Sequence, residues 1–313
     1  MLEENVYLSD HSNFKIGGPA KFFALVKTEG EAVQAAREAK EKGLPIFILG
    51  GGTNILIPDE GLEAVVIKTG FGGISLEEGN KLRVGSGVLV SDLLNFCIEN
   101  EFSGFEWAGG LPGTVGGAVF GNAGAFGGEI KDNLLSVKAI DLGAEKPKME
   151  TYDHGQCCFE YRNSFFKKNS LNGKRMMILE VLFQMQKGNR EEIKERIQEK
   201  IDYRESRQPL EYPNIGSIFK NISWDSLSGE LQEKFKDVKK TDPFDVLPTA
   251  AVIHDAGLKE MRVGGAMVSP KHPNFIINFD RATAKEINEL ANKVKEKIEE
   301  MYGIELEREV IFL

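Results

Sequence analysis

A glycine-rich segment runs from Ala108 to Glu129, where nine of the 22 residues are glycine. Glycine allows backbone turns and close approaches that a Cβ atom would forbid, so this density predicts tight turns and backbone that lies against a neighbour. The segment is not low-complexity sequence, because larger side chains interrupt it; they include Leu111, Pro112, Val115, Val119, Phe120, Asn122 and Phe126. We therefore expect an ordered structure here.

A second glycine cluster follows residues 46–49, an apolar run that predicts a short buried strand. Its members are Gly50, Gly51, Gly52, Thr53 and Asn54. Such a loop can present N–H groups to a diphosphate. It is not a Rossmann fingerprint, because Ile55 fills the third glycine position, and no Gly-Lys-Ser/Thr follows as in a Walker A loop. Either glycine loop alone could be a structural turn; together they suggest one extended ligand with a diphosphate and a ring system, which FAD fits.

Helix and strand signals alternate along the chain and indicate a mixed α and β fold. Capping boxes predict helix starts at Thr28 with Glu31 and at Thr283 with Glu286, and an apolar stripe predicts a helix over 189–207. Further short apolar runs predict strands at residues 64–67, 82–84, 136–142, 176–185 and 304–312. The polar segment from Asn221 to Pro243 is expected to be an exposed insertion.

The composition excludes several classes of protein. A length of 313 residues suggests two or three modules. A formal net charge of −9 argues against wrapping nucleic acid, which needs a basic surface. Three cysteines, two of them adjacent, are not a disulfide framework and fit a reducing compartment. We find no signal peptide and no apolar stretch of the ~20 residues that a membrane span needs, so we expect a soluble, cytoplasmic protein.

The loop from Gly216 to Asn221 carries candidate catalytic residues. No Gly-x-Ser-x-Gly elbow surrounds Ser217, which argues against a hydrolase nucleophile. A buried, hydrogen-bonded serine can instead donate a proton, and Lys220 could bind an anion. For a lone serine in a loop, a turn hydrogen bond is the commoner role.

Other charged residues are weaker candidates on their own. Arg162 follows Tyr161 in a polar loop and could bind a carboxylate through two hydrogen bonds, although most surface arginines do not. Alternating glutamates near the C-terminus share one face of the predicted strand, which could equally be a solvated face; they are Glu305, Glu307 and Glu309. The four histidines have no metal-ligand spacing, so no metal site is predicted.

Taken in order, these motifs resemble the UDP-N-acetylenolpyruvoylglucosamine reductase family. The resemblance includes Tyr161-Arg162-Asn163-Ser164 and Leu306-Glu307-Arg308-Glu309-Val310. The further matching segments are 13–20, 49–56, 111–129, 208–209, 216–221, 256–259, 264–266 and 271–278. No single motif is decisive, but the ordered set covers nearly the whole chain. The Gln208-Pro209 and His-x-Asn-Phe patterns are similar to the shorter, type II branch of the family.

The resemblance implies an α+β fold. Residues 1–75 and 76–200 would be two subdomains of an FAD-binding fold of the vanillyl-alcohol-oxidase/PCMH type, and 201–313 an α+β substrate-binding domain whose final strand returns to the active site. FAD would be bound non-covalently. The residues implied to hold it are Gly50, Gly51, Gly52, Thr53, Asn54, Pro112, Gly113, Thr114, Gly116, Gly117, Asn122 and Ala123.

The resemblance also implies an activity in peptidoglycan precursor synthesis, in which NADPH reduces the flavin. Flavin N5 then passes hydride to the enolpyruvyl methylene carbon of UDP-N-acetylglucosamine enolpyruvate. Arg162 would stabilise the charge that develops beside the substrate carboxylate, Glu309 would be the acidic partner, and Ser217 would donate the proton. Family position thus selects Glu309 over Glu307. The residues implied to contact the substrate are Arg204, Lys220 and Asn221.

Two alternatives remain open at this point. Another FAD-linked oxidase or dehydrogenase of the same fold is one, although many such enzymes attach flavin through His or Cys and neither glycine loop contains a histidine. A nucleotide-sugar-binding protein without the reaction is the other, and it would be expected to lack one of Arg162, Ser217 and Glu309. The expected partner is the small-molecule substrate, with no nucleic acid and no membrane, and the expected assembly is a monomer.

Overall fold

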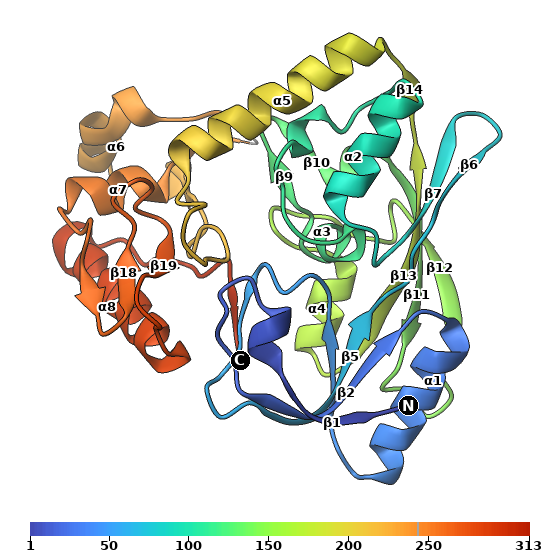
Figure 1. The fold of residues 1–313 in the computed structure, drawn as a ribbon. Coiled ribbons are helices and arrows are strands. Elements are labelled where there is room, and N and C mark those ends of the chain that lie inside the picture. Colours follow the sequence, from blue (N-terminus) through green and yellow to red (C-terminus); the bar gives the residue numbers. More distant parts are fainter. Residues whose placement is uncertain (243) are drawn as a thin grey trace. The chain divides into compact units, whose positions relative to one another are not determined.

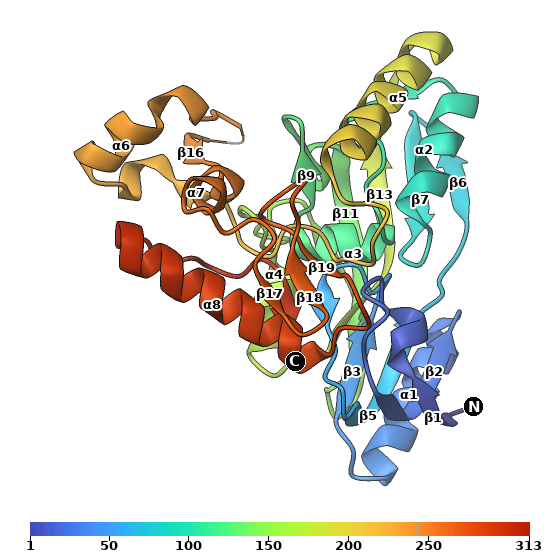
Figure 2. The ribbon, with the colours of Figure 1, turned by 60° about the vertical axis from the view of Figure 1, so that its left-hand side comes forward.

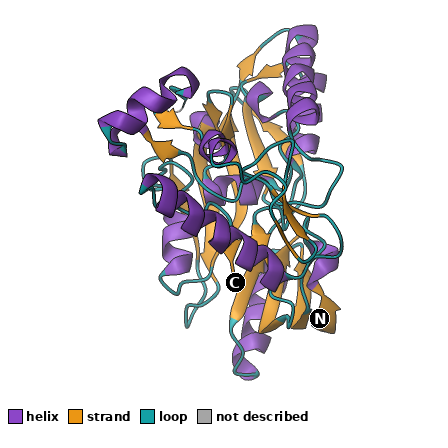
Figure 3. Ribbon diagram, turned by 90° about the vertical axis from the view of Figure 1, so that its left-hand side faces the viewer, coloured by secondary structure: helices purple, strands orange, loops and turns teal. Residues whose placement is uncertain are grey.

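The computed structural model describes residues 1–242 and 244–313. These residues form two compact units. Unit 1 consists of Met1–Val6, Pro19–Gly51 and Leu62–Tyr203, and unit 2 of Tyr7–Gly18, Gly52–Gly61 and Arg204–Leu313. Helices and strands occur throughout both (Figure 3). Unit 2 therefore contains most of the domain expected over 201–313, and it adds two short segments from the N-terminal part of the chain. The three-part division expected from the sequence stays a prediction.

The first sheet of unit 1 has the strand order β1-β2-β5-β3. These strands are β1 (Glu3–Tyr7), β2 (Pro19–Val26), β3 (Ile46–Leu49) and β5 (Leu62–Thr69). Both β2 and β3 pair with β5 in parallel. Helix α1 (Glu29–Glu41) packs against this sheet through a row of buried alanines, and its capping box at Thr28 and Glu31 is confirmed. Figure 1 shows α1 beside β2 and β5.

The second sheet of unit 1 is antiparallel, with the order β12-β11-β13-β7-β6. Its strands are β6 (Ile74–Glu77), β7 (Lys81–Gly85), β11 (Leu134–Asp141), β12 (Met149–Asp153) and β13 (Met176–Gln184). One apolar core joins it to α2 (Val90–Glu99), α3 (Val115–Gly121) and α4 (Phe165–Leu171). Residues of β11 and β13 also enter the core under α1, so both sheets of unit 1 belong to one packed body.

Short strands and a long helix complete unit 1. The two-stranded pairs are β8 (Phe102–Ser103) with β14 (Gln186–Lys187), and β9 (Gly124–Ala125) with β10 (Gly128–Glu129). Helix α5 (Arg190–Arg207) begins within one residue of the predicted start, and Ile193 and Ile197 of its apolar stripe are buried in the unit 1 core.

Unit 2 is built around a three-stranded antiparallel sheet, β17 (Arg262–Val263), β18 (Ala266–Val268) and β19 (Ile276–Asn278). The predicted C-terminal helix is confirmed as α8 (Ala284–Tyr302), with a capping box at Thr283 and Glu286 and a left-handed C-cap at Gly303. Figure 2 shows α8 lying along this sheet, and its apolar face packs there. Further elements are α7 (Thr249–Asp255) and β4 (Ile55–Leu56), which pairs in parallel with β20 (Ile311–Phe312).

Two expectations about unit 2 need correction. The strand predicted over 304–312 is a regular strand only at Ile311–Phe312, with one isolated bridge at Arg308. The 221–243 segment is not simply an exposed insertion. It forms β15 (Ile222–Ser223), which pairs with β16 (Val246–Leu247), and α6 (Gly229–Phe235). Its widely spaced apolar residues enter the unit 2 core; they are Trp224, Leu227 and Phe235. Pro243 lies outside the described residues.

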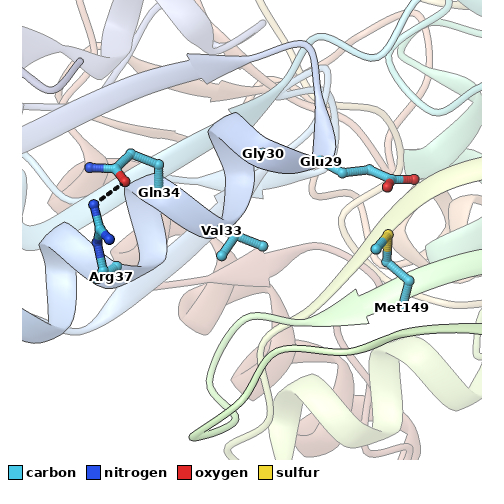
Figure 4. A pocket seen from close by; sticks show the side chains of 6 residues that line it. All are labelled: Glu29, Gly30, Val33, Gln34, Arg37 and Met149. Carbon is cyan, nitrogen blue, oxygen red and sulfur yellow. Dashed lines mark hydrogen bonds between the residues drawn. The ribbon is translucent and has the colours of Figure 1, made fainter.

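No helix among the described residues is long and apolar enough to cross a bilayer. A surface hollow of about 350 Å³ lies where α1 faces Met149 of β12, lined also by Glu29, Val33 and Arg37 (Figure 4). It contains none of the site residues predicted from the sequence.

Candidate active site

The two glycine loops of unit 1 lie against each other. Gly50 and Gly51 follow β3, and a Cβ atom added to Gly51 would lie 2.8 Å from Cα of Gly113. A Cβ atom on Gly50 would lie 3.3 Å from the hydroxyl oxygen of Thr114. The backbones therefore approach more closely than side chains would permit. This arrangement, called the glycine cradle below, consists of Gly50, Gly51, Gly113 and Thr114.

The start of α3 fixes one wall of the glycine cradle. Thr114 is the N-cap, and its side chain accepts a hydrogen bond from the Gly117 N–H at 3.3 Å. Gly116 donates its N–H to the Ser86 carbonyl at 2.9 Å, and a Cβ atom on Gly116 would lie 2.7 Å from Cβ of Ser86. Close packing on Ser86 thus requires glycine at position 116. Gly117 meets no such neighbour, because its Cβ would approach only Thr114, at 3.4 Å.

Asn122 ends α3 in a left-handed conformation, with φ of 45°. Its side-chain amide donates to Oε1 of Glu129 at 3.1 Å and to the Glu160 carbonyl at 2.9 Å. Asn122 therefore ties the glycine-rich segment to the loop before Arg162. Its Oδ1 and the indole N–H of Trp107 are buried without a hydrogen-bond partner among the described residues. A buried polar atom of this kind indicates a place where a bound group can supply the partner.

Arg162 sits in a tight two-residue turn closed by backbone hydrogen bonds in both directions between Glu160 and Asn163, each 3.1 Å. Its φ is +54°, which is uncommon for a residue with a side chain and is typical of functional sites. Lys167 donates to the Arg162 carbonyl at 3.0 Å, and Nη2 of Arg162 donates to the Gly124 carbonyl at 2.8 Å. The guanidinium is therefore anchored to the glycine-rich segment.

In unit 2, backbone hydrogen bonds join the segment that follows Ser217 to the segment that contains Glu309. The Glu309 N–H donates to the Ile218 carbonyl at 2.9 Å, and the Lys220 N–H donates to the Glu307 carbonyl at 2.9 Å. Ser217 and Glu309 are both half-buried, whereas Glu305 and Glu307 are exposed. The alternation expected for the three glutamates therefore holds for Glu305 and Glu307 but not for Glu309, and the segment is not a regular strand.

The other predicted residues of unit 2 lie around this pair. Lys220 forms an ion pair with Glu307, and Asn221 accepts a hydrogen bond from the Thr249 N–H at 3.3 Å. Asn54, from the first glycine cluster, directs its amide at the Glu309 carbonyl at 3.4 Å. Arg204, near the end of α5, is buried, with 8% of its surface exposed.

The first glycine cluster is divided between the units after Gly51. Gly52 has a φ of +67°, and a Cβ there would lie 2.0 Å from the His11 carbonyl oxygen, so only glycine fits this position. Thr53 is half-buried in unit 2, and Pro112, in unit 1, is exposed. Ala123 is held by its N–H, which donates to the Ala118 carbonyl at 2.8 Å.

The titratable groups near the site do not suggest metal binding. No cluster of three or more metal-ligating residues occurs among the described residues. His272 stacks edge-on against Phe275, and burial lowers the pKa of its imidazole to about 4. The ring is therefore neutral at neutral pH, and no added positive charge comes from it.

The structure brings together some predicted residues and leaves others untested. In unit 1, the glycine loops meet and Arg162 is anchored to the second of them. In unit 2, backbone hydrogen bonds join Ile218 to Glu309 and Lys220 to Glu307, and Asn54 bonds the Glu309 carbonyl; Ser217 is the residue next to Ile218. A centre that combines Arg162 with Ser217 and Glu309 stays a prediction. Sequence reasoning missed the roles of Glu307 and Thr249 as partners of Lys220 and Asn221, because both pairs are far apart in the chain.

Comparison with known proteins gives the class first. Residues 20–145 match a family model described as an FAD binding domain. With the glycine cradle, this match identifies an FAD-binding protein, and the FAD-binding fold predicted from the sequence is confirmed. Residues 208–313 match a second family model, the C-terminal domain of UDP-N-acetylenolpyruvoylglucosamine reductase.

The relatives define the family. A UDP-N-acetylenolpyruvoylglucosamine reductase from Clostridium botulinum (strain Eklund 17B / Type B) is 34% identical over 99% of this chain and 92% of its own length. One from Fervidobacterium nodosum is 37% identical over 98% and 90%. The crystal structure of the Thermus caldophilus reductase matches with a TM-score of 0.77, 29% identity, and coverage of 100% and 99%. The chain belongs to the UDP-N-acetylenolpyruvoylglucosamine reductase family and is an oxidoreductase.

Proposed function

We propose that this chain reduces UDP-N-acetylglucosamine enolpyruvate to UDP-N-acetylmuramate in the cytoplasm, with non-covalently bound FAD and with NADPH as the electron donor. The family membership supports the reduction of a peptidoglycan precursor. The observation that carries the proposal is the backbone hydrogen bond from Glu309 to Ile218, the residue after Ser217, in a chain that also matches an FAD binding domain. The proposed monomer needs no second chain for these contacts.

The residues present fit FAD. The glycine cradle offers backbone without side chains, as a diphosphate requires, and Thr114 adds a hydroxyl there. The unpartnered Oδ1 of Asn122 and indole N–H of Trp107 could meet polar groups of a bound ligand. When bound, FAD would supply the capacity to take hydride from NADPH and pass it to the substrate. Gly116 and Gly52 lie against other neighbours, Ser86 and His11, and close packing requires glycine at both positions.

Each proposed catalytic residue has a distinct task. Hydride added to the methylene carbon leaves negative charge on the adjacent carbon and on the substrate carboxylate. Arg162, whose backbone is fixed by the Lys167 contact, would stabilise that charge. Ser217 would donate its hydroxyl proton to the adjacent carbon, which completes the saturated product. Glu309 would hydrogen-bond the substrate during this proton transfer. Lys220, Asn221 and Arg204 would bind the substrate.

A visible absorption spectrum of the purified protein tests the proposal. We expect flavin bands that bleach when NADPH is added without oxygen and return when the enolpyruvyl substrate is added. NADH is the matched control for the electron donor. Bands that bleach with NADPH but do not respond to the substrate would point to another oxidase or dehydrogenase of this fold. A colourless protein that takes up no added FAD would contradict the whole proposal.

We expect Gly51→Ala to weaken FAD binding. The added Cβ would lie 2.8 Å from Cα of Gly113, a backbone atom that cannot move aside cheaply. Overpacking of about 1–3 kcal/mol corresponds to roughly 5- to 150-fold weaker binding. The ratio of flavin to protein absorbance and titration of the apoprotein with FAD measure the effect.

Gly30→Ala is the matched control for this substitution. Gly30 lies in α1, and its added Cβ would meet no atom within 4 Å. We expect normal FAD binding and a small gain in stability, because alanine favours helix over glycine. Equal FAD affinity in Gly51→Ala and the wild type would show that the glycine cradle does not hold the cofactor.

A further inference from the structure

The buried side chain of Asn274 holds the peptide groups of Phe219. Its Oδ1 accepts the Phe219 N–H at 3.1 Å, and its Nδ2 donates to the Phe219 carbonyl at 2.8 Å. Asn274 is 3% exposed and Phe219 is 2% exposed, so both bonds are shielded from solvent. The backbone of Asn274 adds a third bond, because its carbonyl accepts the Ile218 N–H at 2.8 Å.

The segment that Asn274 holds, residues 217–220, contains two residues of the proposed site. Ser217 precedes Ile218, and Lys220 follows Phe219. The Ile218 carbonyl accepts from the Glu309 N–H, the Lys220 N–H donates to Glu307, and the Lys220 carbonyl accepts from the Thr249 hydroxyl at 2.5 Å. Every peptide N–H and C=O from 218 to 220 therefore has a partner, and the two of Phe219 depend on the Asn274 side chain.

We propose that Asn274 is a positioning residue that fixes the segment carrying Ser217 and Lys220 for proton delivery. This inference deepens the proposed function and rests on it. Asn274 does not contact the reacting atoms; it acts through peptide 219. Asparagine suits the task because its amide offers one donor and one acceptor side by side, which match the donor and acceptor of a peptide group.

Apolar and ionised side chains at position 274 could not make both hydrogen bonds to the peptide groups of Phe219. An apolar residue would leave a buried N–H and a buried C=O without partners, and the segment would shift to satisfy them. An ionised aspartate would keep an acceptor for the Phe219 N–H but would place negative charge against the Phe219 carbonyl. A protonated carboxyl group, in contrast, offers a donor and an acceptor like the amide.

The first test compares Asn274→Ala with Asn278→Ala in the FAD-loaded protein. Asn278 is a matched control in the same unit, since its amide also bridges backbone, from Phe14 at 3.0 Å to Ala282 at 2.7 Å, without touching residues 217–220. We expect Asn274→Ala to slow flavin reoxidation by the enolpyruvyl substrate on the order of 100-fold while reduction by NADPH changes by less than about 2-fold. Asn278→Ala should change neither rate by more than that.

A structural readout accompanies the rates. Hydrogen exchange of the peptide covering 216–221 should rise in Asn274→Ala and stay at the wild-type level in Asn278→Ala, because only the former frees the Phe219 N–H. The double variant with Ser217→Ala should be no slower than Ser217→Ala alone by more than about 2-fold, since both changes remove the same step. Independent, additive losses would contradict a positioning role.

Asn274→Asp tests the same bonds without removing the side chain. Burial raises the pKa of an introduced carboxyl, so that lowering the pH should protonate it and restore a donor toward the Phe219 carbonyl. We expect its reoxidation rate, divided by that of the wild type, to rise as the pH falls. A flat ratio would overturn the proposal even if Asn274→Ala failed to fold.

The outcomes separate this inference from the proposed function. If the reduced wild-type protein is not reoxidised by the substrate, the proposed function fails and the role of Asn274 falls with it. If the wild type turns over and Asn274→Ala does so equally fast with unchanged exchange at 216–221, only the role of Asn274 is wrong.

Discussion

Ser217→Ala is expected to leave the reduction of bound flavin by NADPH nearly unchanged and to slow its reoxidation by the enolpyruvyl substrate by about 10²- to 10⁴-fold, the usual contribution of a general acid. The two half-reactions separate because the proton is needed only when the substrate carbon is saturated. The alanine side chain keeps the backbone bonds of Ile218 to Glu309 and to Asn274. Stopped-flow absorbance measures each half-reaction.

Ser226→Ala is the matched serine control. Ser226 is exposed in unit 2 and its hydroxyl donates only to the Ser223 carbonyl, at 2.7 Å. We expect the rates of both half-reactions to stay within about 2-fold of the wild type. The lost turn hydrogen bond is worth about 1 kcal/mol of stability and does not involve the site residues. If Ser217→Ala slowed flavin reduction instead of reoxidation, the proton-donor role would be wrong.

Elements with strong local signals could be predicted from the sequence. Helix α8 begins at a capping box and ends at a left-handed glycine, and both signals are encoded within four residues. The periodicity of the sequence also predicts the apolar stripe of α5, whose Ile193 and Ile197 are buried. The 221–243 segment was misjudged because its polar composition masks Trp224, Leu227 and Phe235, which are anchored by partners elsewhere in unit 2.

Contacts between distant segments could not be predicted from composition or periodicity. Phe219 and Asn274 are 55 residues apart, and Lys220 and Glu307 are 87 apart. The left-handed conformation of Arg162 was equally hidden, because arginine has no preference for it; the bonds between Glu160 and Asn163 impose it. Sequence motifs thus identified the loops, whereas the hydrogen bonds that fix their conformation could be seen only in the folded structure.

The glycines of the sequence indicate where the backbone comes close to a neighbour, but not which neighbour it is. Gly51 and Gly116 look alike in the sequence, and both were assigned to the cofactor. In the structure, Gly51 faces the backbone of the second glycine loop, whereas Gly116 is required by Ser86 beneath α3. A dense glycine segment therefore predicts close approach of the backbone, and the cofactor role of both glycines stays a prediction.

Glu309→Gln is expected to reduce turnover by about 10²-fold or more, the usual loss when a charged group that acts on the transition state is removed. Glutamine keeps the size of the side chain and the backbone bond from Glu309 to Ile218, so the loss would report the carboxylate itself. Steady-state kcat with the enolpyruvyl substrate, and single-turnover reoxidation of the flavin, measure it.

Two neighbouring glutamates make this comparison decisive. Glu307→Gln removes only an ion pair with Lys220 from an exposed side chain, and such pairs are worth about 0–1 kcal/mol, so we expect a loss of no more than about 5-fold. Glu305→Gln removes a pair with Lys295 at 2.9 Å on the same exposed side and should leave turnover near the wild-type value. Because all three substitutions neutralise one charge within five residues, a general electrostatic effect would lower turnover equally in each. Equal losses in Glu307→Gln and Glu309→Gln would therefore remove the reason for assigning the acidic role to Glu309, whereas a loss confined to Glu309→Gln would locate the reacting substrate beside the bond from Glu309 to Ile218.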